Sequence, residues 1–85
     1  MAGFATGKIH SIYPDAAGCY FQFHDNVSPR PKDGLFQIKL SHDNYDSLFS
    51  LLVTAAMAGK PILARAREEI SANEHANVIY LKMEF

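Results

Sequence analysis

Cys19 is the first residue to consider as a catalytic group, because thiolates are strong nucleophiles. It alternates with Phe21 and Phe23 in "CYFQF", so it shares the apolar face of an expected strand. A thiol in that position is buried and behaves as a small apolar side chain. As the only cysteine, it cannot form a disulfide within the chain. We therefore interpret Cys19 as a core residue and predict no catalytic residue.

The histidines and carboxylates lack the spacing of a metal site. The histidines are His10, His24, His42 and His75. They fall on different segments, without the close His/Cys pairs or the His-Glu-x-x-His spacing of zinc sites. Asp43 and Asp46 lie about one turn apart at the start of an expected helix, where they complement its dipole. We expect no metal, no cofactor and no enzymatic activity.

Basic, hydroxyl and aromatic side chains on two expected strands are the candidates for ligand binding. These candidates are Phe4, Thr6, Lys8, Arg65 and Arg67. Arg65 and Arg67 alternate in "PILARAR", so they share one strand face, and guanidinium groups suit carboxylates and phosphates. A solvated edge with surface ion pairs to nearby glutamates explains the same arginines. Both interpretations remain open at this point.

Alternating apolar and polar residues predict five strands separated by turns and loops. Their segments are 4–13, 19–24, 35–40, 61–67 and 76–85. In the first strand the parity of the apolar positions changes near His10 and Ser11, which indicates a bulge or a strong bend. In the third, Phe36, Ile38 and Leu40 are expected to point inward.

One helix is expected between the third and fourth strands. Ser41 can cap its first turn, and Gly59 and Pro61 end it. The helical spacing predicts a core face formed by Tyr45, Leu48, Phe49, Leu52 and Ala56. The segment has no lysine or arginine between Lys39 and Lys60.

The opposite face of this helix is small and uncharged, where a solvated helix usually carries Lys, Glu or Arg. A modestly charged surface helix explains this composition, and so does packing against another subunit. Val78 and Tyr80 leave the outer face of the last strand apolar as well, as if it were covered. The residues expected at an oligomer interface are Ser47, Ser50, Thr54, Met57, Val78 and Tyr80.

Length and composition indicate one domain over residues 1–85, because 85 residues with 48% hydrophobic content supply one small core. The net charge of −1 makes nucleic acid an unfavoured partner. No apolar run reaches the roughly 20 residues of a membrane helix, and no signal-peptide pattern is visible. We expect a soluble chain without membrane insertion, secreted if a leader has been removed.

The order of three strands, a helix and two strands is that of an OB-fold, a five-stranded Greek-key barrel with one helix between strands three and four. The chain also resembles the OB-fold B subunits of bacterial AB-type toxins, especially subtilase cytotoxin and its pertussis-like relatives. The resemblance rests on "TGKIHSIYPDAAGCYFQF" and, more specifically, on "NYDSLFSLLVTAAMAGKPI". The chain departs from that family in lacking its paired cysteines.

The resemblance implies a homo-oligomeric ring, with five subunits favoured, whose helices line a central pore. It also implies that Thr6, placed before Gly7, matches the hydroxyl residue that contacts sialic acid in that family, with Arg65 available to the sugar carboxylate. A catalytic partner subunit would accompany such a protein. We therefore expect a non-enzymatic glycan-binding and assembly module. The alternative is an OB-fold protein that binds single-stranded nucleic acid through Tyr20, Lys39 and the arginines.

Overall fold

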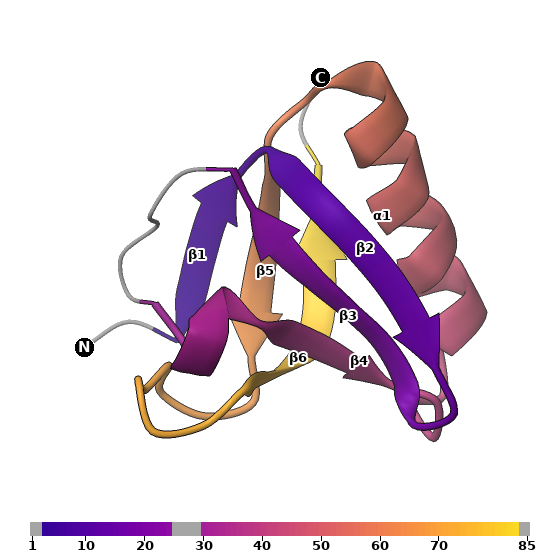
Figure 1. The fold of residues 1–85 in the computed structure, drawn as a ribbon. Helices are drawn as coiled ribbons and strands as arrows, with labels where there is room; N and C mark the ends of the chain where they lie inside the picture. The colour runs from indigo at the N-terminus through magenta and orange to yellow at the C-terminus, as the bar shows by residue number, and fades with distance from the viewer. Residues whose placement is uncertain (1–2, 25–29, 84–85) are drawn as a thin grey trace.

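The computed structural model describes residues 3–24 and 30–83 and is mainly β with one helix, as predicted (Figure 1). A 3-10 helix, η1 (Lys32–Gly34), precedes the fourth strand. The elements are β1 (Phe4–Gly7), β2 (Ile9–Asp15), β3 (Gly18–Phe23), β4 (Phe36–Lys39), α1 (Tyr45–Ala58), β5 (Ile62–Ala66) and β6 (Ala76–Lys82). In the described residues, no helix is long and apolar enough to cross a membrane.

All six strands belong to one sheet with the order β1-β5-β6-β4-β3-β2. Neighbouring strands are antiparallel except for β4 and β6, which are parallel. The outermost strands, β1 and β2, are separated in the chain only by Lys8, so the sheet curls into a half-barrel (Figure 1). The Lys8 carbonyl accepts a hydrogen bond of 2.8 Å from the His24 N–H beside this bend.

The first predicted strand is divided, which raises the number of strands from the expected five to six. Its two halves pair with different neighbours, β1 with β5 and β2 with β3, so the chain must turn at Lys8. The pairing of β2 with β3 also shifts register between Ile9 and Ser11. The bulge or bend predicted near His10 and Ser11 is therefore confirmed.

The helix begins later than predicted. It starts at Tyr45, and no side chain caps its N-terminus, so Ser41 is not the cap. The preceding residues form turns instead: the His42 ring accepts the Asn44 N–H at 3.0 Å and lies 3.0 Å from the Ile79 carbonyl oxygen. Gly59 ends the helix as predicted, with φ of 65° and its N–H directed to the Ala55 and Ala56 carbonyls.

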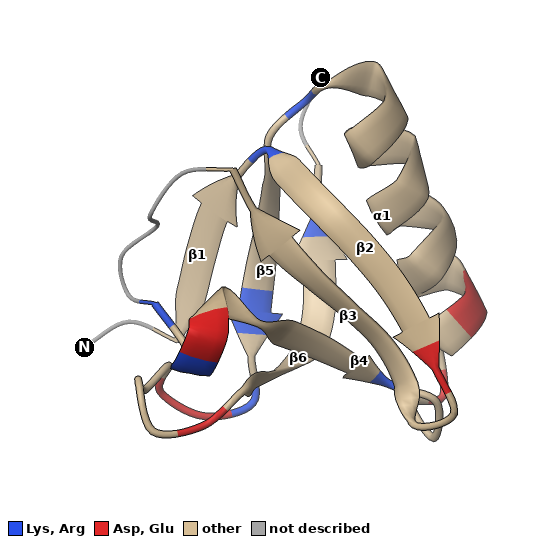
Figure 2. Cartoon of the chain, viewed as in Figure 1, with Lys and Arg blue, Asp and Glu red and all other residues tan. Residues whose placement is uncertain are grey.

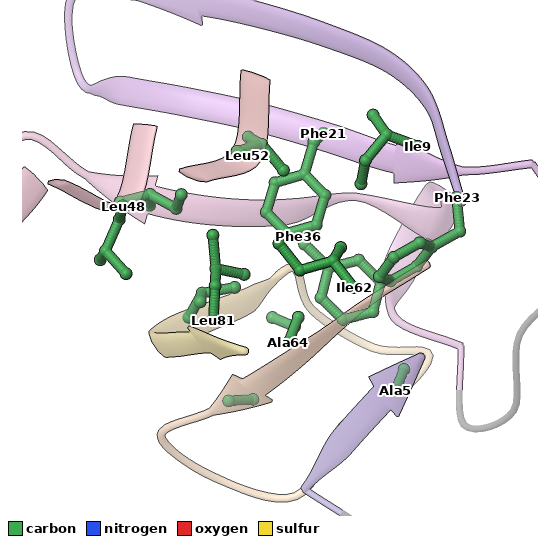
Figure 3. Close-up of a cluster of buried hydrophobic side chains, with 14 of the residues drawn as sticks. Ala5, Ile9, Phe21, Phe23, Phe36, Leu48, Leu52, Ile62, Ala64 and Leu81 are labelled. Atoms are coloured by element: carbon green, nitrogen blue, oxygen red, sulfur yellow. The ribbon is translucent and has the colours of Figure 1, made fainter. Parts of the chain in front are cut away.

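The core fills the space between the curled sheet and α1 (Figure 3). The rings of Phe21, Phe23 and Phe36 pack with centroids 5.0 to 5.7 Å apart. Leu48 and Leu52 enter from the helix. The predicted inner face of the helix is correct for these leucines, although Ala55 is fully buried and Tyr45, Phe49 and Ala56 are only partly buried.

The last strand breaks the predicted alternation. The β5–β6 pairing shifts register where Arg65 pairs with Tyr80 but Ala66 pairs with Val78, so one extra residue lies on β6. Val78 consequently turns inward and is only 3% exposed, and the prediction of Val78 on an outer interface is wrong. Leu40, expected inward, is 57% exposed because β4 ends at Lys39.

The loop predicted between the second and third strands falls partly on residues 25–29, which lie outside the described residues.

The polar loop between β5 and β6 contains one buried apolar residue, which its overall composition does not indicate. Ile70 is only 2% exposed and belongs to the core cluster, so this loop is fixed to the core by an apolar side chain.

Candidate functional site

The outer face of β1, β5 and β6 brings an arginine between two aromatic side chains. In the strand register Phe4 lies opposite Arg65, and Arg65 lies opposite Tyr80. Directly opposed residues have Cβ atoms about 4.5–5.5 Å apart, so the three side chains form one continuous row. Phe4 and Tyr80 are 44% and 48% exposed, which leaves their rings available to a ligand.

The next row along the same face adds a hydroxyl beside an apolar hollow. Thr6 lies opposite Leu63, and Leu63 lies opposite Lys82. Together with Pro61 these residues line a hollow of about 230 Å³. Arg65 is two residues from Leu63 on β5, so its position is diagonal to Thr6, and its guanidinium group extends toward Gly3, away from Thr6.

The charge of this face is positive. The strands β1, β5 and β6 contain no Asp or Glu, while Arg65 and Lys82 are basic (Figure 2). A guanidinium binds a carboxylate with two parallel hydrogen bonds, and an aromatic ring packs on the apolar face of a sugar ring. One fork-shaped cation in a row with two exposed rings therefore suits a ring-shaped ligand with a single carboxylate.

The other two predicted ligand residues lie apart from this row. Lys8 is exposed at the bend between β1 and β2. Arg67 follows the end of β5, and its backbone N–H donates to the Asn77 carbonyl at 2.8 Å. Arg67 lines a different hollow together with Lys39, and Arg65 is not among the residues that line it.

The helix residues predicted at an interface do share one surface. Ser47, Ser50, Thr54 and Met57 are all exposed on α1, and Met57 is 85% exposed. The Thr54 hydroxyl donates to the Ser50 carbonyl at 2.8 Å, so this polar group is satisfied within the helix. The surface offered to a neighbour is therefore small and weakly polar. Tyr80, predicted for the same interface, lies instead in the row with Arg65.

Cys19 has the environment of a core residue. It is fully buried, and its thiol lies 3.7 Å from the Tyr20 carbonyl oxygen. Burial, with a smaller contribution from the Asp15 carboxylate, raises the pKa of the Cys19 thiol from 9.0 to about 11. A thiol with this pKa stays protonated and unreactive at neutral pH. Within the described residues, no group of three or more His, Cys, Asp or Glu side chains could hold a metal.

A second row on the sheet's outer face was not predicted. The register places Tyr13 opposite Tyr20, Tyr20 opposite Gln37, and Gln37 opposite Asn77, across four strands. The two tyrosine rings stack with centroids 5.2 Å apart, and His75 contacts Tyr20 edge-on at 5.6 Å. Alternation marks Tyr20 and Gln37 as outward-facing, but it gives Asn77 the parity of Ile79 and Leu81, on the predicted inner face. Only the strand register places the four residues side by side.

Comparisons with known proteins identify no relative. No family model matches the chain, and searches of curated proteins and of solved structures found no significant match. The functional interpretation therefore depends on the geometry described above.

Proposed function

We propose that the protein is a non-enzymatic OB-fold module that assembles into a ring of identical subunits, with five favoured, and binds an acidic glycan on the outer face of β1 and β5. The glycan-binding part of this proposal rests on one observation, the row of Phe4, Arg65 and Tyr80 with Thr6 in the adjoining row.

The sheet order supports the OB-fold assignment. When β1 and β2 are taken as two halves of one bent strand, that strand pairs at both ends of the sheet, with β5 and with β3. The single parallel contact joins β4 and β6, and α1 connects β4 to β5. A Greek-key barrel with a helix between its third and fourth strands has this connectivity.

The size and charge of the site favour an acidic sugar over a polyanion. A nucleic acid needs several cations along its backbone, whereas the row contains one arginine and the chain has a net charge of −1. The aromatic rings can pack on a sugar ring, and Thr6 can donate to a sugar hydroxyl. The apolar walls formed by Pro61 and Leu63 suit a methyl group such as that of an N-acetyl substituent.

The exposed face of α1 supports the proposed assembly into a ring. It carries Ser, Thr and Met side chains with no basic residue, and its one acidic residue, Asp46, lies in the first turn, so identical helices can approach along the later turns without charge repulsion. Native mass spectrometry together with light scattering at micromolar concentration tests this assembly. We expect a mass five times that of the chain. A monomer under both conditions would refute the ring.

Glycan binding is tested by titrating the protein with 3′-sialyllactose and following the amide NMR shifts. Lactose is the uncharged control. We expect saturable binding of the acidic sugar alone. Hydrogen bonds to charged groups contribute about 1.5–3 kcal/mol, so Arg65→Gln should weaken binding by roughly 10- to 150-fold. Thr6→Arg should abolish it by filling the hollow, while Lys39→Gln, on another surface, should leave it unchanged. Equal binding of the two sugars would refute a carboxylate-reading site.

A further inference from the structure

A polar hollow lies where the parallel strands β4 and β6 separate. These strands pair only at Phe36 with Ala76 and at Gln37 with Asn77. Beyond that point the chain from Lys39 to His42 turns away, and the space between the strands opens into a hollow of about 480 Å³. Its lining residues are Lys39, Ser41, His42, Arg67, Glu68, Asn77 and Val78. This volume is in the range of small-molecule sites.

Hydrogen bonds hold the two segments around the hollow, one after β4 and one after β5, against β6. The His42 ring accepts the Asn44 N–H and lies 3.0 Å from the Ile79 carbonyl oxygen, which fastens the segment after β4 to β6. The Arg67 N–H donates to the Asn77 carbonyl at 2.8 Å, which fastens the segment after β5 to the same strand. The positions of the lining residues are thus set before any ligand arrives.

The side chains of the hollow provide more donors than the protein uses. Lys39 and Arg67 form no ion pair within the described residues, and the side chains of Ser41 and Asn77 make no hydrogen bond there. These four groups come from the end of β4 and the segment after it, from β6 and from the segment after β5, so they surround a ligand from several sides. Two cations face one carboxylate, that of Glu68, which leaves a net positive site.

We propose that this hollow binds a phosphate group, free or as a phosphomonoester, through Lys39, Arg67 and Asn77. A tetrahedral oxyanion directs its acceptor oxygens toward donors on different sides, whereas the two oxygens of a carboxylate lie on one side of the group. Arg67 supplies a fork for two oxygens, and Lys39 supplies a point charge from the end of β4, on the other side of β6. This site is separate from the acidic-sugar row, because Arg65, Thr6 and Phe4 do not line it.

The test is an amide NMR titration of the whole chain with inorganic phosphate at constant ionic strength, using chloride as the balancing anion. We expect saturable shifts at Lys39, Ser41, Arg67 and Asn77. Arg67→Gln should weaken phosphate binding at least tenfold, and the matched control Arg65→Gln, which removes the same charge from the sugar-binding face, should leave it unchanged. Glu68→Gln should tighten binding, because it removes the opposing carboxylate.

Two further ligands distinguish the sources of the phosphate. Ribose 5-phosphate that binds as tightly as phosphate, or more tightly, supports a phosphomonoester site. A single-stranded oligothymidylate that binds in preference to phosphate, with affinity falling steeply as salt rises, would overturn the proposal in favour of a nucleic-acid surface. Shifts that chloride reproduces, or equal loss in the Arg65 and Arg67 variants, would also overturn it. The test of the acidic-sugar site is independent of these results, because it uses a different ligand.

Discussion

Gly18 allows β3 and β4 to approach each other, and its replacement is the sharpest test of the sheet geometry. It pairs with Lys39 and has φ of 143°, which side-chain-bearing residues rarely adopt. An added Cβ would overlap the Ile38 carbonyl oxygen and lie 2.8 Å from the Leu40 nitrogen. Both are backbone atoms of the neighbouring strand segment, so the contact cannot be relieved by a rotamer change. We expect Gly18→Ala to destabilise the protein severely.

The magnitude follows from two contributions. An unfavourable φ costs about 1–3 kcal/mol, and overpacking costs about 1–3 kcal/mol, for a total of about 2–6 kcal/mol. A chain of this length has a free energy of unfolding of only about 4–13 kcal/mol. Gly59→Ala is the matched control, because Gly59 also has positive φ, 65°, but no atom lies within 4 Å of its added Cβ. Only the conformational cost of about 1–2 kcal/mol remains there.

The assay is urea unfolding followed by circular dichroism for the wild type and both variants. Any entropy that alanine removes from the unfolded chain is common to the two variants and cancels in their comparison. We expect Gly18→Ala to lose about 1–4 kcal/mol more than Gly59→Ala, or to fail to fold while Gly59→Ala folds. Equal losses would refute the close approach of β3 and β4.

Two other predictions concern the core thiol and the helix. The folded state holds the Cys19 proton up to a pKa of about 11, above the ordinary 9.0, so this contribution to stability is complete below pH 9 and is lost as pH rises toward 11. Urea midpoints at pH 8 and pH 10.5 should therefore fall more in the wild type than in Cys19→Ala, and identical decreases would contradict burial of the thiol. On α1, Ser50→Lys should change monomer stability by less than about 0.5 kcal/mol but reduce the oligomer mass measured by light scattering. Ala16→Lys, in the exposed β2–β3 turn, should leave the mass unchanged; an unchanged mass in both variants would show that the helix face is solvated.

The two proposed sites use different parts of the same sheet. The acidic-sugar row lies on the faces of β1, β5 and β6, where regular pairing sets side chains opposite one another. The phosphate hollow lies where the pairing of β4 and β6 stops. We therefore propose that Arg65 and Arg67 bind different ligands, although they are only two residues apart in the chain. Each arginine is the control for the other.

Local patterns in the sequence determined most of the elements. Alternation in "CYFQF" places Cys19, Phe21 and Phe23 in the core, and Gly59 ends the helix because it can adopt a left-handed conformation. The change of parity near Ser11 marked the β2 bulge. These features depend on neighbours in the chain, so periodicity and backbone preference are enough to predict them.

The tertiary structure decided which side chains meet. A register shift opposite Arg65 and Ala66 turns Val78 into the core, and alternation gave no sign of it because Val78 and the next residue, Ile79, are both apolar. The row of Phe4, Arg65 and Tyr80 and the hollow shared by Lys39 and Arg67 join segments far apart in the chain. Such contacts depend on strand order and register, which long-range pairing and core packing determine together. A single sequence specifies them only through the complete fold.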